Sequence, residues 1–107
     1  MSEAKVSVII IEPGKNARHV NISPRLENLQ KIVGGYVRMF IITDDCCFLC
    51  DDDGQPKNLP YNFSAFGQNF FGPVIWIGTS GEDFCDLPIT FQAAKILFPE
   101  MFNREVK

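Results

Sequence analysis

The segment Leu29–Val37 constrains this chain most strongly, because a helical pattern ends there on two glycines and a strand pattern follows at once. Gly34 and Gly35 predict the end of the helix, since glycine adopts the left-handed conformation without a Cβ clash. The order of helix, glycine and strand is the reverse of a phosphate-binding loop, in which the glycines precede a helix. The segment therefore predicts a helix that passes directly into a sheet.

The helix before the glycine pair is indicated by apolar residues at spacings of three and four, which form one face. They are Leu26, Leu29, Ile32 and Val33. Ser23 is a suitable N-cap and Pro24 suits the first helical position. The sequence therefore predicts a helix of roughly ten residues that packs one face on a sheet.

Strand patterns flank this helix on both sides. Val6–Ile11 and Val74–Ile77 are continuously apolar, which is typical of central strands. Ala17–Ile22 follows a Pro-Gly turn and predicts a returning strand. Tyr36–Ile42 and Cys46–Cys50 predict a second hairpin, which a turn at 51–54 follows with Gly54 in the left-handed region.

The remaining segments are less regular. Phe63–Phe71 mixes aromatic and polar residues, and we expect a short helical turn there, capped by Asn62 or Ser64. A final helix, capped by Asp86 or Thr90, is predicted from its apolar face and ends or bends at Pro99. That face comprises Phe91, Ala94, Leu97 and Phe98. The chain is predicted to form a single α+β domain over residues 1–107, a mostly antiparallel sheet of about 5–6 strands with two helices packed on it.

Charge and hydropathy exclude several classes of protein. The formal net charge is −3 and the ten Lys and Arg residues are scattered, which disfavours nucleic-acid binding. No apolar run is long enough for a signal peptide or a membrane span, so we expect a soluble cytoplasmic protein. Ten phenylalanines are many for 107 residues, and some of them are candidates for a surface that faces a partner.

The four cysteines, Cys46, Cys47, Cys50 and Cys85, include a formal C-x-x-C. In a strand, alternation directs Cys47 and Cys50 to opposite faces and places Cys46 and Cys50 on one face. A zinc site would then need Cys85 and His19 to join that pair. We therefore predict reduced core thiols, with no metal ion and no cofactor.

Several short motifs resemble those of a known family. They are Ile11–Lys15, Leu29–Val37, Asp52–Gly54, Leu59–Asn62, Gly72–Val74 and Gly81–Phe84. Together they make the chain similar to the domain-of-unknown-function family 3846. The resemblance implies a small protein of bacteria, phages or other mobile elements, and it implies no activity, cofactor or catalytic residue. The cysteine-rich strand and Phe63–Phe71 depart from the pattern of the family.

No catalytic pattern accompanies these motifs. His19 is the only histidine, and without a serine elbow or a paired cysteine it predicts an exposed strand residue. The aspartates at 44–45 and 51–53 fit β-turns, where their side chains accept local hydrogen bonds, better than a calcium loop. We therefore expect a protein that is not an enzyme.

Two groups of residues are candidates for binding. The first comprises polar or amphipathic residues in the family-like segments, which would line a site if their turns meet at one sheet edge: Glu12, Lys15, Tyr36, Asn62, Glu82 and Asp83. The second comprises phenylalanines expected at the surface: Phe63, Phe66 and Phe70. The alternative is that the polar group consists of ordinary turn residues.

These features support two hypotheses of function. The first is a non-enzymatic accessory protein of a phage or mobile element that binds a host or phage protein, such as a defence component. The second is a domain that binds or sequesters a small nucleotide-like molecule at the turn cluster. The sequence does not indicate an oligomeric state.

Overall fold

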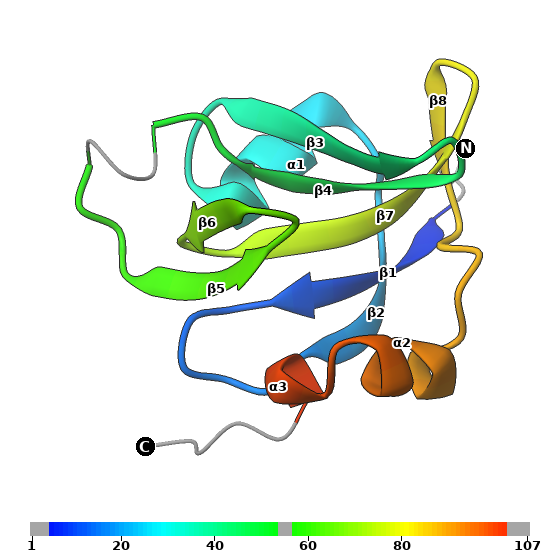
Figure 1. Cartoon of the computed structure of the whole chain (residues 1–107). Coiled ribbons are helices and arrows are strands. Elements are labelled where there is room, and N and C mark those ends of the chain that lie inside the picture. Colours follow the sequence, from blue (N-terminus) through cyan, green and yellow to red (C-terminus); the bar gives the residue numbers. More distant parts are fainter. Residues whose placement is uncertain (1–4, 54–56, 103–107) are drawn as a thin grey trace.

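The computed structural model describes residues 5–53 and 57–102 and has an α+β architecture, which confirms the predicted fold class (Figure 1). Its main sheet is six-stranded and antiparallel, in the order β2-β1-β7-β4-β3, with β8 paired to β7. The strands are β1 Val6–Ile11, β2 Arg18–Ile22, β3 Val37–Thr43, β4 Cys46–Asp51, β5 Tyr61–Ala65, β6 Gln68–Phe71, β7 Val74–Ser80 and β8 Asp83–Cys85. The helices are α1 Leu26–Val33, α2 Phe91–Leu97 and α3 Pro99–Phe102.

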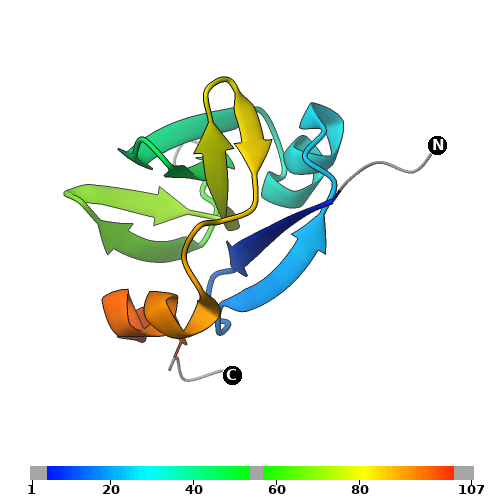
Figure 2. The same ribbon diagram turned by 90° about the vertical axis from the view of Figure 1, so that its right-hand side faces the viewer.

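The centre of the sheet consists of the apolar strands β1, β7 and β4, as their sequences predict. Alternate residues of β1 face opposite layers. Val8 and Ile10 pack with Leu29 of α1 on one side. Ile9 and Ile11 pack on the other side, under the β5–β6 hairpin and the C-terminal helices. Figure 2 shows α1 and α2 on opposite sides of the sheet.

Helix α1 ends as the glycine pair predicts. Gly34 has φ of 92°, in the left-handed region, and its N–H donates to the carbonyl of Gln30 at 2.8 Å. The start of the helix differs from the prediction. Arg25 occupies the N-cap position without a side-chain cap, because Ser23 lies two residues too early to cap and its carbonyl instead accepts the Asn28 side chain.

The second glycine allows a close contact with the end of β4. Asp51 is buried, and Lys57 donates to its Oδ2 at 2.8 Å and to the carbonyl of Gly34 at 3.4 Å. A Cβ on Gly35 would lie 2.5 Å from Lys57 Nζ and 2.7 Å from Asp51 Oδ2. Gly35 therefore leaves the space that this ion pair fills. Gly54, predicted to be left-handed, lies outside the described residues.

The segment Phe63–Phe71 forms a hairpin, so the predicted helical turn is wrong. Strands β5 and β6 pair from Tyr61↔Phe71 to Ala65↔Gln68. Phe66 and Gly67 join them with φ of 52° and 74°, which is the turn that matches the twist of a two-residue hairpin. The hairpin buries Phe63 and Phe70 against Phe48, with ring centroids 5.4 Å apart in both pairs.

The C-terminal helices close the same layer. Thr90 caps α2, as predicted, and its hydroxyl accepts the N–H of Ala93 at 3.1 Å. Pro99 begins the short helix α3, so the chain bends there as predicted. Ala94 is buried and Phe98 packs on Trp76 at 5.4 Å between ring centroids. Leu97 instead points outward, which contradicts its predicted place on the buried face.

Candidate functional site

The predicted turn residues do not gather at one edge of the sheet. Glu12 and Lys15 lie in the turn after β1, beside the start of β7, because Ile11 pairs with Val74. Glu82 lies in the turn that follows β7, at the opposite end of β7, and Asp83 is the first residue of β8. The turn cluster proposed from the sequence is therefore divided between two ends of the molecule.

Tyr36 and Asn62 have different surroundings again. Tyr36 is exposed beside a shallow pocket that Gln30, Asp53 and Lys57 also line. Asn62 is buried, and its Nδ2 donates to the carbonyls of Ile11 and Gly72, both at 2.8 Å. These bonds join three of the segments that carry the family resemblance, and they tie the hairpin to β1. The Asn62 amide thus has a structural role between the hairpin and β1.

The three predicted surface phenylalanines separate into two kinds. Phe63 and Phe70 are buried in the aromatic core around Phe48, so their expected exposure is wrong. Phe66 is 57% exposed at the tip of the hairpin. Alternation along β5 and β6 explains the difference, because a two-residue turn projects its own side chains away from the paired strands.

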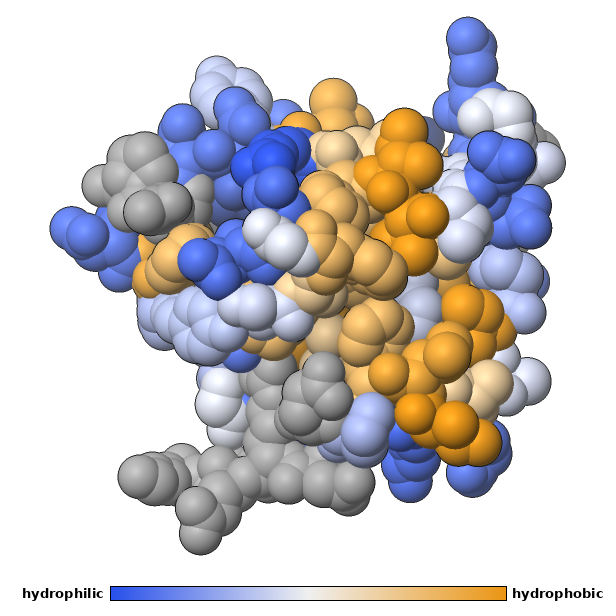
Figure 3. Space-filling view, in the orientation of Figure 1, coloured by the Kyte–Doolittle hydropathy of each residue, from blue (hydrophilic) through white to orange (hydrophobic). Residues whose placement is uncertain are grey.

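Phe66 borders an apolar groove between the hairpin and α2, which we call the hairpin groove. It has a volume of about 560 Å³, and its main lining residues are Ile42, Cys46, Phe66, Trp76, Ile89, Leu97 and Phe98. Leu97 is 58% exposed at its rim. Figure 3 shows apolar side chains gathered over this region of the surface.

The floor of the hairpin groove includes Trp76, whose side chain is almost completely buried. Its indole N–H has no hydrogen-bond partner among the described residues. Among the described residues, Asp45 is the charged residue of the lining, which includes no described lysine or arginine. The groove is therefore suited to apolar groups and poorly suited to phosphate.

The sequence pointed to Phe66 but not to the rest of the groove. Ile96, Leu97 and Phe98 are consecutive apolar residues at the end of α2, and a short helix cannot bury three successive side chains on one face. Ile96 and Leu97 are exposed as a result. That apolar run was the available signal for an exposed patch.

The cysteines lie as strand alternation predicts. Cys46 and Cys50 contribute to the core under the hairpin, and Cys47 faces the α1 side. Burial raises the pKa of Cys47 to about 12, with a smaller contribution from Cys46. Burial also raises the pKa of Cys50, partly offset by Arg38. The thiols of Cys47 and Cys50 are therefore protonated at neutral pH and are weak nucleophiles.

His19 is exposed on β2, as predicted, and its Nε2 is within hydrogen-bond reach of Ser7 Oγ. The nearby carboxylate, Asp86, accepts the backbone N–H of Ser7 at 2.7 Å instead of orienting the imidazole. A serine–histidine nucleophile needs that third group and donors for an oxyanion. Among the described residues, Asp86 therefore does not complete a serine–histidine–carboxylate triad with this pair.

The comparison with protein families matches residues 5–102 to the domain of unknown function DUF3846. The chain belongs to this family. No curated protein and no solved structure matches it. Among the described residues, none of the helices has the length and apolar character that a membrane crossing requires.

Proposed function

We propose that this chain is a non-enzymatic accessory protein that binds an apolar segment of a partner protein in the hairpin groove. The observation that carries this proposal is the groove itself, a hollow of about 560 Å³ with Phe66 and Leu97 more than half exposed at its rim. Exposed aromatic and aliphatic side chains around a preformed pocket are typical of the anchor sites of protein interfaces.

The biological setting of the proposal comes from the family resemblance. We propose a phage or mobile-element protein that acts in the cytoplasm on a host component, such as part of a defence system. Genes for counter-defence proteins beside the gene for this chain would support that role. Neighbours that all encode metabolic enzymes would contradict it.

The test compares two leucines of equal exposure on different faces. Leu97 is 58% exposed at the hairpin groove, and Leu26 is 59% exposed on α1. A partner captured from host lysate is identified, purified and titrated against both lysine variants. We expect Leu97→Lys to weaken binding by about tenfold or more, because it places a charge in an apolar contact. Leu26→Lys should bind like the unmodified protein, and equal losses in both variants would contradict the proposal.

A second candidate function is the capture of a small molecule, because the volume of the groove lies within the range of small-molecule sites. The described residues of its lining include no cation, which favours an apolar ligand over a nucleotide. A ligand that binds only the folded state raises the melting temperature. A rise with a nucleotide panel would support the nucleotide-like ligand predicted from the sequence, and a rise with apolar compounds alone would support the groove.

A further inference from the structure

Strand β3 forms an open edge of the main sheet. In the described part of the chain it pairs with β4 alone, so every second residue directs its N–H and C=O away from the sheet. Met39 is 47% exposed and Ile41 is 69% exposed on this strand. Natural edge strands usually carry lysine, proline or other charged residues that prevent pairing with another chain.

The opposite edge of the sheet is built differently. Strand β2 also has one neighbour, β1, but its exposed residues are the polar Arg18, His19 and Asn21. Strand β3 also exposes Arg38, but its Met39 and Ile41 offer apolar contacts on the α1 side of the sheet, whereas every exposed residue of β2 is polar. This difference indicates that β3 is the edge available for a partner.

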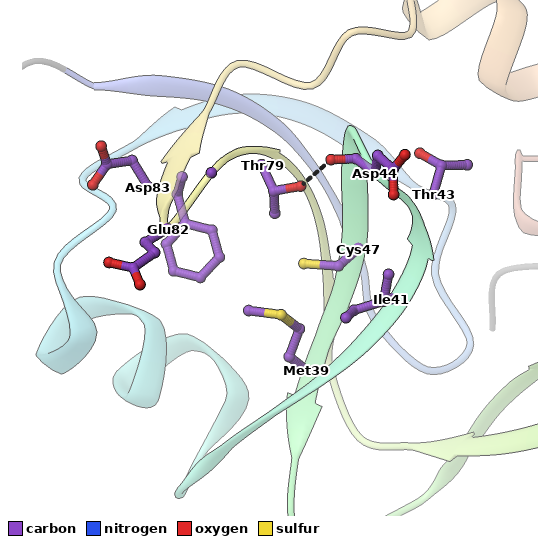
Figure 4. Close-up of a pocket in the computed structure, with 10 residues that line it drawn as sticks. Met39, Ile41, Thr43, Asp44, Cys47, Thr79, Glu82 and Asp83 are labelled. Carbon is purple, nitrogen blue, oxygen red and sulfur yellow. Dashed lines mark hydrogen bonds between the residues drawn. The ribbon is translucent and has the colours of Figure 1, made fainter.

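A pocket lies beside β3, on the face of the sheet that α1 covers, and we call it the edge pocket. It has a volume of about 240 Å³, and its apolar side is formed by Met39, Ile41 and Phe84. Figure 4 shows Met39 and Ile41 on the strand, with Glu82 of the β7–β8 turn and Asp83 of β8 across the pocket. Thr79 Oγ1 donates to the carbonyl of Asp44 at 3.1 Å and joins the two walls.

The charged residues at the edge pocket have a single sign. Asp44, Glu82 and Asp83 line it, and no lysine or arginine from residues 5–53 and 57–102 does. The carboxylates do not converge on a metal position, because the described residues contain no cluster of three suitable ligands. A lysine side chain complements this pocket, since its aliphatic stem packs on apolar walls while its ammonium group reaches the carboxylates.

We propose that β3 and the edge pocket bind an extended peptide segment of a partner protein, with a lysine flanked by apolar residues. The peptide backbone adds a strand to the free edge of β3, and the lysine enters the edge pocket. Strand addition derives affinity from main-chain hydrogen bonds and specificity from pockets for alternate side chains. This surface adjoins the proposed partner contact in the hairpin groove, because Thr43 lines both pockets, but Leu97 lines the hairpin groove and not the edge pocket.

The test uses short synthetic peptides with one lysine among alternating valines, titrated into the purified protein and followed by backbone NMR shifts. We expect shifts concentrated on β3 and on the turn between β7 and β8. A peptide with lysine replaced by glutamate should bind about tenfold more weakly. A peptide N-methylated at alternate residues, which cannot pair with a strand, should lose binding by at least about tenfold.

Protein variants locate the contact. Ile41→Lys should weaken peptide binding by about tenfold, because it adds a cation at the edge and beside the peptide lysine. Asn21→Lys on β2 should leave the affinity unchanged. Leu97→Lys should also leave it unchanged, which separates this proposal from the one for the hairpin groove. Circular dichroism of each variant checks that the fold is retained.

Three outcomes would overturn the proposal. One is the absence of binding by any peptide at about 1 mM. Another is equal binding of the lysine, glutamate and N-methylated peptides. The third is a dimer of the protein in sedimentation that Ile41→Lys dissociates, because β3 would then be occupied by a second copy of this chain.

Discussion

Lys57 Nζ lies 2.8 Å from Asp51 Oδ2, in an ion pair whose carboxylate is buried and whose ammonium group remains partly exposed. The pair connects the end of β4 to the turn that leads out of α1, because Lys57 also contacts the carbonyl of Gly34. It explains why two glycines end the helix. Gly34 supplies the left-handed turn and Gly35 supplies the space for the pair.

Gly35→Ala should destabilise the protein by roughly 1–3 kcal/mol, because its Cβ would displace a buried, hydrogen-bonded carboxylate. Chemical denaturation measures this cost. The cost of Gly35→Ala together with Lys57→Ala should be smaller than the sum of the two single costs, since both substitutions break the same pair. Strictly additive costs would show that Gly35 acts in another way.

The ion pair also makes stability depend on pH. Burial alone would raise the pKa of Asp51, but hydrogen bonds from Lys57 and the Asp53 N–H, with the charge of Lys57, lower it below the ordinary value of 3.8. A lowered native pKa stabilises the fold above pH 3.8, and this contribution is lost as the pH falls below it. Unfolding free energies measured down the acid range should decline less steeply in Lys57→Met than in the unmodified protein.

At alkaline pH the same ion pair is expected to lose its stabilising effect as the pH rises. The hydrogen bond to Asp51 raises the pKa of Lys57 above its ordinary value of 10.5. Its contribution is therefore complete below pH 10.5 and is lost as the pH rises through the raised value. The same Lys57→Met variant should lack this alkaline loss, and an unchanged profile would contradict the pairing.

Asn62→Ala should cost roughly 2–4 kcal/mol, because it leaves the carbonyls of Ile11 and Gly72 without the amide that binds them. Asn69→Ala, at an exposed position on the same hairpin, should change stability by less than about 0.5 kcal/mol. Thermal and urea denaturation of both variants provide the comparison. Equal losses of stability in the two variants would contradict the structural role of Asn62.

The cysteines should differ in reactivity. Cys46, Cys47 and Cys50 are buried, whereas Cys85 is partly exposed on β8. An aromatic disulfide reagent should therefore modify Cys85 first in the native protein, and the other three thiols should react only on unfolding. Mass spectrometry of the labelled peptides identifies the site, and Cys85→Ser should abolish the fast phase. Early labelling of Cys47 would show that the α1 face opens in solution.

Much of the fold follows from local patterns. The apolar runs of β1 and β7 predict central strands, and the glycines after Val33 predict the end of α1. The hairpin at 61–71 was missed because a bulge between Tyr61 and Phe63 interrupts the alternation that marks a strand. Its two-residue turn at Phe66 and Gly67 was the remaining signal.

The candidate sites were less predictable because they depend on which segments meet. Sequence reasoning selected Glu82 and Asp83 as turn residues, but their position opposite Met39 depends on the pairing of β7 with both β8 and β4. Likewise, Leu97 and Phe66 line the same groove only because the hairpin folds over Phe48. Non-local pairing of this kind has no local pattern in a single sequence.

The position of β7 in the sheet has a consequence for how the chain folds during synthesis. β7 lies between β1 and β4, so the hairpins β1–β2 and β3–β4 have no strand partner in common until residues 74–80 have left the ribosome. Until then both hairpins expose apolar faces. The pairing of β7 with β1 closes a loop that contains most of the chain between them, which slows the completion of the sheet. A nascent chain whose β7 has not yet left the ribosome should therefore be a client for chaperones, whereas the released, folded chain should not.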